Sequence, residues 1–417
     1  MSSGNLVIPT NTKPYVWSDE LDKSEFIFAT YRVTAVCSGD KAALGMAMEQ
    51  SVSTEIIKGY ASSETLGDWT IRVCGVTSIP NETAQDAVPP YFLNTEVYSA
   101  SQETGSNCFE IDLAIPARLL YGKPAQLLNV MVGELPRLGF LTSLSLIEAR
   151  LPVGFGPGPA FGRGGILALL DTQEGPLLCR AMRPGVGLDT STMARLNKDV
   201  LVGGFHLVKD DELICFPTMG KYREHLEAML VARNEAMQLT GERKLYLANL
   251  ICEPDELEER WETCCELGVD GVLVAPYIQG LGVLPLLAKQ KQMPILAHNS
   301  FSDMLTRHST WGIDDAVLCH WLRHLGADWF VTPGAFASKA MNPLAASNLM
   351  RAATDKVEGI RDMMPNIQGG KHPGDLDTYC KAVGDGDFML IVANWVDSHP
   401  EGLVYAAKEF RDTIDRK

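Results

Sequence analysis

Residues 201–213 read LVGGFHLVKDDEL, an apolar segment that ends in four charged residues. The apolar part has the length and composition of a buried strand. The charged residues Lys209, Asp210, Asp211 and Glu212 follow this strand directly and do not form the exposed face of a helix. In a barrel of parallel strands, functional side chains lie in the loops that follow the strands. The stretch therefore predicts a buried strand whose carboxyl end carries a functional site.

Seven further segments of this kind lie between residues 176 and 395, separated by helical segments such as 222–238 and 255–268. The eight strand segments are PLLCRAMRP (176–184), LVGGFHLV (201–208), KLYLANLI (244–251), GVDGVLVAPY (268–277), MPILAHNS (293–300), ADWFVTPG (327–334), MPNIQGG (364–370) and DFMLIVANW (387–395). Eight such units predict a (β/α)8 TIM barrel over residues 151–417. A doubly wound sheet is the competing fold, but units of near-equal length favour closure.

The segment before residue 151 has a different pattern. Residues 1–24 predict an extended N-terminal arm, and residues 25–150 mix strand and helix patterns, which predicts a small α+β domain of the ferredoxin-like type. Its strands are FIFATYRV (26–33), WTIRVCGVTSI (69–79) and CFEIDLAIP (108–116), and its helix is KAALGMAMEQSVSTE (41–55). Residues 154–165, GFGPGPAFGRGG, predict a linker, because they lack the Lys-Ser/Thr of a phosphate loop and the spacing of a dinucleotide fingerprint.

Charge and cysteine usage exclude several classes of protein. The net charge is −16 with basic residues scattered along the chain, so binding to nucleic acid or to an anionic membrane is not expected. No apolar run approaches the roughly 18 residues of a membrane helix, and no signal peptide is expected at the N-terminus. The ten cysteines show no CxxC spacing. These features predict a cytoplasmic protein with reduced thiols.

The opening stretch also carries a family resemblance. GGFHLVKDDEL (203–213) resembles the metal-binding segment of the ribulose-1,5-bisphosphate carboxylase/oxygenase (RuBisCO) large chain. Other segments resemble landmarks of this family in the same order: PLLCRAMRPGVGL (176–188), LAHNSFSDMLTRHSTWGI (296–313), LGADWFVTPG (325–334), NIQGG (366–370) and HPEG (399–402). The resemblance extends from about residue 25 onward.

The resemblance implies a Mg2+ site formed by Lys209, Asp211 and Glu212. In the family the lysine reacts with CO2, and its carbamate becomes a third oxygen ligand. Mg2+ prefers such hard oxygen ligands, and burial lowers a lysine pKa toward the neutral amine that this reaction needs. On the pattern alone, a solvated acidic turn is the alternative.

Departures from the family pattern point away from CO2 fixation. Two lysines that serve carboxylation and proton abstraction in the family are Arg183 and Gly185 here, and an arginine after the histidine of strand five is Asn299. An asparagine of the N-terminal domain is replaced by Glu134. The chain therefore resembles the non-carboxylating RuBisCO-like proteins, also called form IV.

Three residues are predicted to carry the chemistry. Arg183 stays protonated, so it suits a grip on a carboxylate, phosphate or enolate oxygen better than proton abstraction. His298 is the more natural acid or base. Glu134 is a second candidate, and by family resemblance it reaches the site from a neighbouring subunit. This implies a homodimer or a larger assembly with shared active sites.

Further residues are predicted to bind the substrate. The backbone amides of Gln368, Gly369 and Gly370 suit a phosphate, and Lys371 and His372 follow them. A second glycine cradle of the family is replaced here by VANWVDS (392–398), so at most one phosphate is expected. The predicted substrate-binding residues are Asn299, Lys339, Gln368, Gly369, Gly370 and Asn394.

These residues favour a Mg2+-dependent lyase or isomerase that acts on a phosphorylated keto sugar or sugar acid through an enediolate. Because Arg183 suits a carboxylate, a decarboxylase or transcarboxylase is favoured, with an isomerase next. A methylthio-diketopentyl phosphate enolase and a methylthioribulose phosphate isomerase, both of methionine salvage, are the alternatives. A non-catalytic barrel that binds a metabolite is an alternative of a different class.

Overall fold

The structure is a computed structural model of the whole chain. It describes residues 12–35, 37–50, 70–80, 107–182, 188–308, 310–338, 341–384, 387–397 and 399–416. The chain divides into two compact units, Met1–Phe155 with Met304–Leu318, and Gly156–Asp303 with Cys319–Lys417. Each unit is described by itself.

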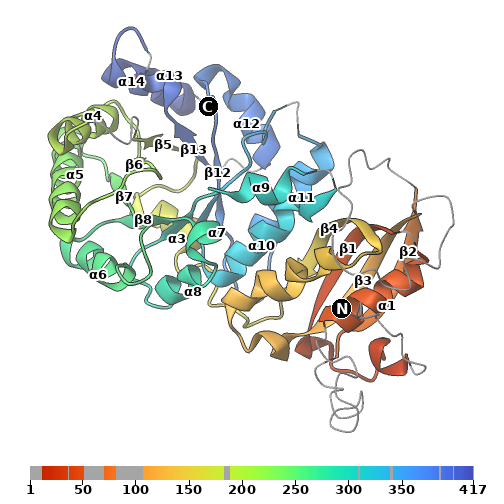
Figure 1. Cartoon of the computed structure of the whole chain (residues 1–417). Coiled ribbons are helices and arrows are strands. Elements are labelled where there is room, and N and C mark those ends of the chain that lie inside the picture. Colours follow the sequence, from red (N-terminus) through yellow and green to blue (C-terminus); the bar gives the residue numbers. More distant parts are fainter. Residues whose placement is uncertain are drawn as a thin grey trace. The chain divides into compact units, whose positions relative to one another are not determined.

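The first unit is built on a five-stranded sheet with the order β10-β4-β1-β3-β2 (Figure 1). Its strands are β1 (Phe26–Ala35), β2 (Arg72–Ile79), β3 (Asn107–Pro116), β4 (Leu141–Arg150) and β10 (Trp311–Ile313), and its helix is α1 (Gly39–Gln50). Strand β1 pairs antiparallel with both β3 and β4, whereas the short β10 runs parallel to β4. The predicted strands are present, and β4 and β10 are additional to them.

The second unit is a closed barrel of eight parallel strands, which confirms the predicted TIM-barrel fold. The strands are β5 (Leu177–Ala181), β6 (Leu207–Lys209), β7 (Leu245–Asn249), β8 (Gly271–Val274), β9 (Ile295–Ala297), β11 (Trp329–Val331), β12 (Met364–Ile367) and β13 (Met389–Val392). The helices are α3 (Gly162–Leu169), α4 (Thr190–Val202), α5 (Met219–Thr240), α6 (Leu257–Leu267), α7 (Pro276–Gln279), α8 (Val283–Ala288), α11 (Pro343–Thr354), α12 (Leu376–Val383), α13 (Asn394–Asp397) and α14 (Leu403–Asp415). Two further helices, α9 (Ser302–Thr306) and α10 (Asp315–Leu325), each belong partly to the first unit.

The barrel strands are buried along their whole length. Apolar side chains from them form one core cluster, which includes Leu177, Leu207, Leu245, Leu247, Leu273, Leu296, Trp329, Met364 and Met389. Strands of a parallel sheet are covered on both faces, so their sequences read as short apolar runs. The core therefore fills the barrel, and polar side chains gather where the strands end.

The glycine-rich segment 154–165 is not wholly a linker, because α3 begins at Gly162. The carboxylate of Asp328 accepts hydrogen bonds from the amides of Phe161 and Gly162, both at 2.7 Å. Its second oxygen accepts the amide of Ile295 at 2.9 Å. A carboxylate distant in sequence thus satisfies amides at the start of the helix, which the local sequence does not reveal.

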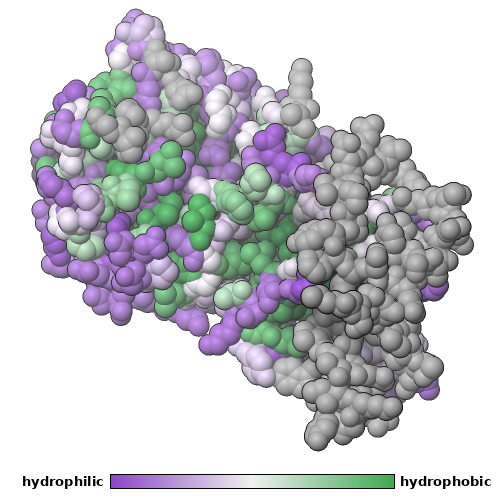
Figure 2. Space-filling model, in the orientation of Figure 1, coloured by the Kyte–Doolittle hydropathy of each residue, from purple (hydrophilic) through white to green (hydrophobic). Residues whose placement is uncertain are grey.

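Polar side chains cover much of the visible outer surface of the second unit, whereas an apolar area lies around α7, α8 and α9 (Figure 2). Among the exposed large apolar residues, Ile278 lies in α7, Leu286 lies in α8, and Phe301 directly precedes α9. None of the helices in the described part of the chain combines the length and apolar character that crossing a membrane requires.

Candidate active site

Lys209 is the last residue of β6, and its side chain is buried at the end of the barrel. Its Nζ donates to the backbone oxygen of Asp210 at 3.0 Å and to Oε2 of Glu212 at 3.1 Å. Burial opposes ionisation of Glu212, but the charges of Lys209 and His298 lower the pKa of Glu212 to about 2. The lysine and the glutamate therefore form a close pair at the strand end.

His298 approaches the same glutamate from the end of β9. Its Nε2 lies 3.4 Å from Oε2 of Glu212. The backbone amide of Ser300 donates to Nδ1 at 3.2 Å, and the hydroxyl of Ser300 lies 2.8 Å from the same nitrogen. Because Nδ1 accepts from an amide, the proton of the neutral ring lies on Nε2, facing Glu212. The local loop thus sets both the tautomer and the orientation of the imidazole.

Asp210 points into the barrel wall and not toward His298. Its carboxylate lies 3.0 Å from Nε2 of His225 and accepts from the hydroxyl of Tyr246 at 2.7 Å and from the amide of Asn249 at 3.0 Å. Burial opposes protonation of His225, but the charge of Asp210 raises its pKa overall. These three contacts satisfy the Asp210 carboxylate, so this acid stabilises the loop.

Asp211 is also buried, and its carboxylate accepts the amide of Leu213 at 2.8 Å. The side-chain amide of Asn249 donates to the backbone oxygens of Asp211 at 3.0 Å and of Ile214 at 3.2 Å. These bonds hold the turn after β6, which carries Asp210, Asp211 and Glu212.

A cavity of about 420 Å³ lies at the end of the barrel in front of Lys209, Glu212 and His298. Asn299 and Gln368 line it as well, and the side-chain amide of Gln368 donates to Oδ1 of Asn299 at 3.0 Å. The remaining wall includes Ser300, Gly369, Gly370, Lys371 and Trp395. Two of the predicted metal ligands, one predicted catalytic residue and several predicted substrate-binding residues thus meet in one cavity, whereas the third predicted metal ligand, Asp211, is not among the residues that line it.

Comparison with known proteins assigns the chain to a family. Residues 165–416, more than half of the chain, match the family described as "Ribulose bisphosphate carboxylase large chain, catalytic domain". The chain belongs to the RuBisCO large-chain family. The resemblance predicted from the opening stretch is therefore confirmed.

Relatives of this RuBisCO-family chain include RuBisCO-like proteins. Over 262 residues it is 31% identical to a 2,3-diketo-5-methylthiopentyl-1-phosphate enolase of Geobacillus thermodenitrificans, and the match spans 62% of this chain and 63% of the enolase, less than two thirds of its length. It is 26% identical over 410 residues, 96% of this chain and 90% of the relative, to a ribulose bisphosphate carboxylase-like protein of Archaeoglobus fulgidus.

A solved relative has the same fold along nearly the whole chain. The crystal structure of a rubisco-like protein (MtnW) from Alicyclobacillus acidocaldarius superposes with a TM-score of 0.80 at 26% identity. The superposition covers 94% of this chain and 93% of the relative. The RuBisCO-like architecture therefore includes the sheet unit as well as the barrel.

The placement of four predicted site residues of this RuBisCO-family chain is not tested by the structure. Arg183 and Lys339 lie outside the described residues, as does the side chain of Asn394. Glu134 belongs to the first unit, where it directly follows the π-helix Asn129–Gly133 and forms an ion pair with Arg137. The roles assigned to these four residues stay predictions.

Sequence reasoning assigned no role to two residues that line the cavity: Ser300 orients His298, and Trp395 forms part of the wall. Lys371, which the sequence places directly after the two glycines of the predicted anion site, lines the cavity as well and is buried with 6% of its surface exposed. The sequence carries no comparable signal for Trp395, whose ring packs edge-on against His372 with the centroids 5.5 Å apart.

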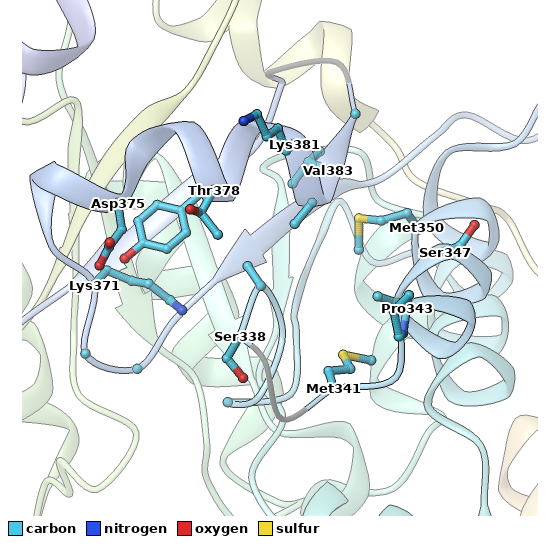
Figure 3. A pocket seen from close by; sticks show the side chains of 18 of the residues that line it. Ser338, Met341, Pro343, Ser347, Met350, Lys371, Asp375, Thr378, Lys381 and Val383 are labelled. Carbon is cyan, nitrogen blue, oxygen red and sulfur yellow. The ribbon is translucent and has the colours of Figure 1, made fainter.

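A second cavity of about 1000 Å³ lies between α11 and α12 (Figure 3). It shares Gly334, Gly369, Gly370 and Lys371 with the smaller cavity. Met341 and Met350 supply apolar surface on one side, and Thr378 and Tyr379 line it from α12. The two cavities therefore meet at the loops after β11 and β12.

Proposed function

We propose that this RuBisCO-family chain is an enolase-type enzyme that moves a proton at a carbon next to the ketone of a phosphorylated keto compound. The observation that carries the proposal is the meeting of Lys209, Glu212 and His298 in one cavity with the Gly369–Gly370 backbone. Such a reaction needs a side chain that transfers the proton, a site for a cation, and backbone amides that bind the anion of the substrate. The enolases among the relatives support this reaction over decarboxylation.

The donors at the end of β6 suit Mg2+ chemically. Glu212 and Asp211 supply carboxylate oxygens, and a carbamate on Lys209 would supply a third oxygen ligand. Within the described ranges, no group of three or more His, Cys, Asp and Glu residues is arranged to hold a metal ion. A divalent cation held by these residues would polarise a neighbouring carbonyl group of the substrate.

His298 is the group that carries the proton. Its Nε2 faces the cavity wall formed by Glu212, and Ser300 holds its Nδ1. A neutral imidazole in this tautomer donates a proton from Nε2, which suits protonation of an enediolate oxygen. Its buried position keeps bulk water from competing for the same proton.

The anion of the substrate binds at the loop after β12. Gly369 and Gly370 both have positive φ angles, +79° and +57°. Both glycines line the cavity, and backbone amides in a loop of this kind suit a phosphate oxygen. Lys371 adds a cation to the same wall of the cavity. This wall of the cavity accommodates one phosphate, while Lys209, Glu212 and His298 contact the reacting part of the substrate.

We further propose a homodimer in which Glu134 of one subunit completes the site of its partner. The apolar area around α7, α8 and α9 supports a subunit contact, since contiguous apolar surface commonly marks an interface. Light scattering combined with size-exclusion chromatography measures this state, and a monomer at micromolar concentration would contradict it.

The reaction is tested by solvent deuterium exchange on a panel of keto sugar phosphates and diketone phosphates. We expect exchange at the carbon next to the ketone that depends on Mg2+ and bicarbonate, and we expect Lys209→Ala to reduce it by at least about 100-fold. Exchange that survives in Lys209→Ala would contradict the assigned site. Incorporation of labelled bicarbonate into ribulose bisphosphate would establish carboxylation instead.

A measurement without substrate separates an enzyme from an inert barrel. Mg2+ and bicarbonate together should raise the melting temperature of the wild-type protein by mass action. The Lys209→Ala variant should show no such rise. An equal rise in both proteins would place the metal elsewhere.

A further inference from the structure

Lys371 is a buried cation that lies over an aromatic ring. Only 6% of its surface is exposed, and its Nζ lies 5.0 Å from the centre of the Tyr379 ring. Among the described residues, Lys371 takes part in no ion pair. Burial lowers the pKa of Lys371, and the charge of Asp375 opposes this shift. A buried charge of this kind is costly unless an anion compensates it, so the position favours an anionic ligand.

The backbone beside Lys371 also suits an anionic ligand. Gly369 and Gly370 adopt the left-handed conformation in succession, and a Cβ atom at Gly370 would meet no other atom within 4 Å. Crowding therefore does not account for glycine at this position, whereas the backbone conformation does. Two exposed amides and one ammonium group thus lie together at the point where the two cavities meet.

The larger cavity continues beyond this point, away from the reacting residues. Figure 3 shows Lys371 pointing into the space between α12 and the loop that carries Ser338, with Met341 and Met350 farther across the cavity. The two methionines supply apolar surface, whereas the rest of the wall includes the hydroxyl of Thr378 and charged residues such as Arg351 and Asp375. A pocket of about 1000 Å³ that has apolar surface beside polar groups can hold an organic ligand.

We propose that the ligand of this chain carries its anion between two organic parts and that the cavity between α11 and α12 binds the distal part. A phosphodiester is the simplest compound of this class. The reacting part lies in the smaller cavity, the anion lies against Lys371 and the Gly369–Gly370 amides, and the distal part contacts Met341 and Met350. The assignment of the reacting part to the smaller cavity rests on the proposed function. Binding of the distal part does not, because it is measured without turnover.

Alkyl phosphates test the distal site directly. Binding of inorganic phosphate, methyl phosphate, butyl phosphate and hexyl phosphate is measured by isothermal titration calorimetry. We expect affinity to rise with chain length, by up to about fourfold for each methylene that becomes buried. Affinity that stays flat or falls with chain length in the wild-type protein would overturn the proposal.

Two variants of α11 decide which cavity the alkyl chain enters. Ala346 lines the larger cavity one turn before Met350, so Ala346→Trp fills the space on this face of the helix. We expect it to abolish the dependence on chain length while inorganic phosphate binds as before. Asn348→Trp, on an exposed part of the same helix, is the matched control and should keep the dependence. A chain-length dependence that survives in Ala346→Trp would overturn the proposal.

The anion site is tested by Lys371→Met, which preserves the length of the side chain and removes its charge. We expect every phosphate of the series to bind about tenfold more weakly, while Lys381→Met, at an exposed position in the lining of the larger cavity, changes affinity little. Unchanged affinity in Lys371→Met would contradict the assigned anion site. Because no step requires turnover, a failure of the enolase proposal leaves these measurements interpretable.

Discussion

Lys209 and Asp210 are neighbours in the chain but have different surroundings. Lys209 closes the end of β6 and faces the cavity, whereas the Asp210 carboxylate is enclosed by His225, Tyr246 and Asn249. A run of charges shows that a site is present, but the direction of each side chain depends on the turn that follows the strand. The family resemblance implied that Asp211 and Glu212 bind the metal. The contacts of Asp210 with the barrel wall explain why this third acid is present.

His298 provides a prediction at the scale of one residue. We expect His298→Asn to lower the rate of substrate deuterium exchange by about 100- to 10,000-fold, because the proton carrier is lost. Ser300→Ala removes only the hydroxyl near Nδ1 and leaves the amide contact, so we expect a loss of about tenfold. Exchange rates measured by NMR at saturating substrate distinguish the two. Equal losses in both variants would show that His298 has only a positioning role.

At the scale of elements, the short helix α13 is tied to the barrel by one buried arginine. The side chain of Arg180, on β5, donates to Oδ1 of Asp397 from Nε at 3.1 Å and from Nη2 at 2.8 Å. Its Nη1 donates to Oδ1 of Asn197 on α4 at 3.2 Å. Three elements therefore depend on one guanidinium group, which holds the segment that carries Trp395 against the cavity.

Asp397→Asn is expected to destabilise the protein by about 3 kcal/mol, because it removes a negative charge that the buried guanidinium group of Arg180 contacts. Chemical denaturation in urea measures this loss. Asp412→Asn removes one partner of the exposed pair with Lys408 and serves as the control, with an expected change within about 0.5 kcal/mol. A similar small change in both variants would contradict the role given to Arg180.

All eight barrel strands were predictable at this scale, because each is a short apolar run buried on both faces. Strand β4 was not predicted, although its burial alternates along part of its length. Strand β10 has only three residues and pairs with β4, 160 or more positions earlier in the chain. The start of α3 also depends on a distant residue, Asp328. Elements that are stabilised by such remote partners leave little local signal.

At the scale of the whole molecule, the barrel encloses titratable groups that affect stability. His324, on α10, is buried, and neither ring nitrogen has a hydrogen-bond partner among the described residues. Burial, together with the charge of Arg323, lowers its pKa to about 4. A histidine whose pKa falls on folding contributes stability above its unfolded pKa of about 6.5, and that stability is lost as the pH falls toward 4.

His324→Phe should therefore make the protein less sensitive to acid. We expect the variant to gain stability relative to the wild type by about 1.4 kcal/mol for each pH unit between pH 6.5 and 4. The free energy of unfolding is measured in urea at pH 7.5, 6 and 5. A difference between the two proteins that stays constant over this range would contradict the assignment.

The sequence by itself determined the barrel, its strand order along the chain and the loop that carries Lys209 and Glu212. This was possible because burial on both faces imposes an apolar run and because parallel strands bring their loops to one end. Only the tertiary structure decided that Asp210 lies in the wall, that Ser300 orients His298, and that two cavities meet at Lys371. Such outcomes depend on which side chains from distant parts of the chain meet, and the local periodicity of the sequence does not predict those contacts.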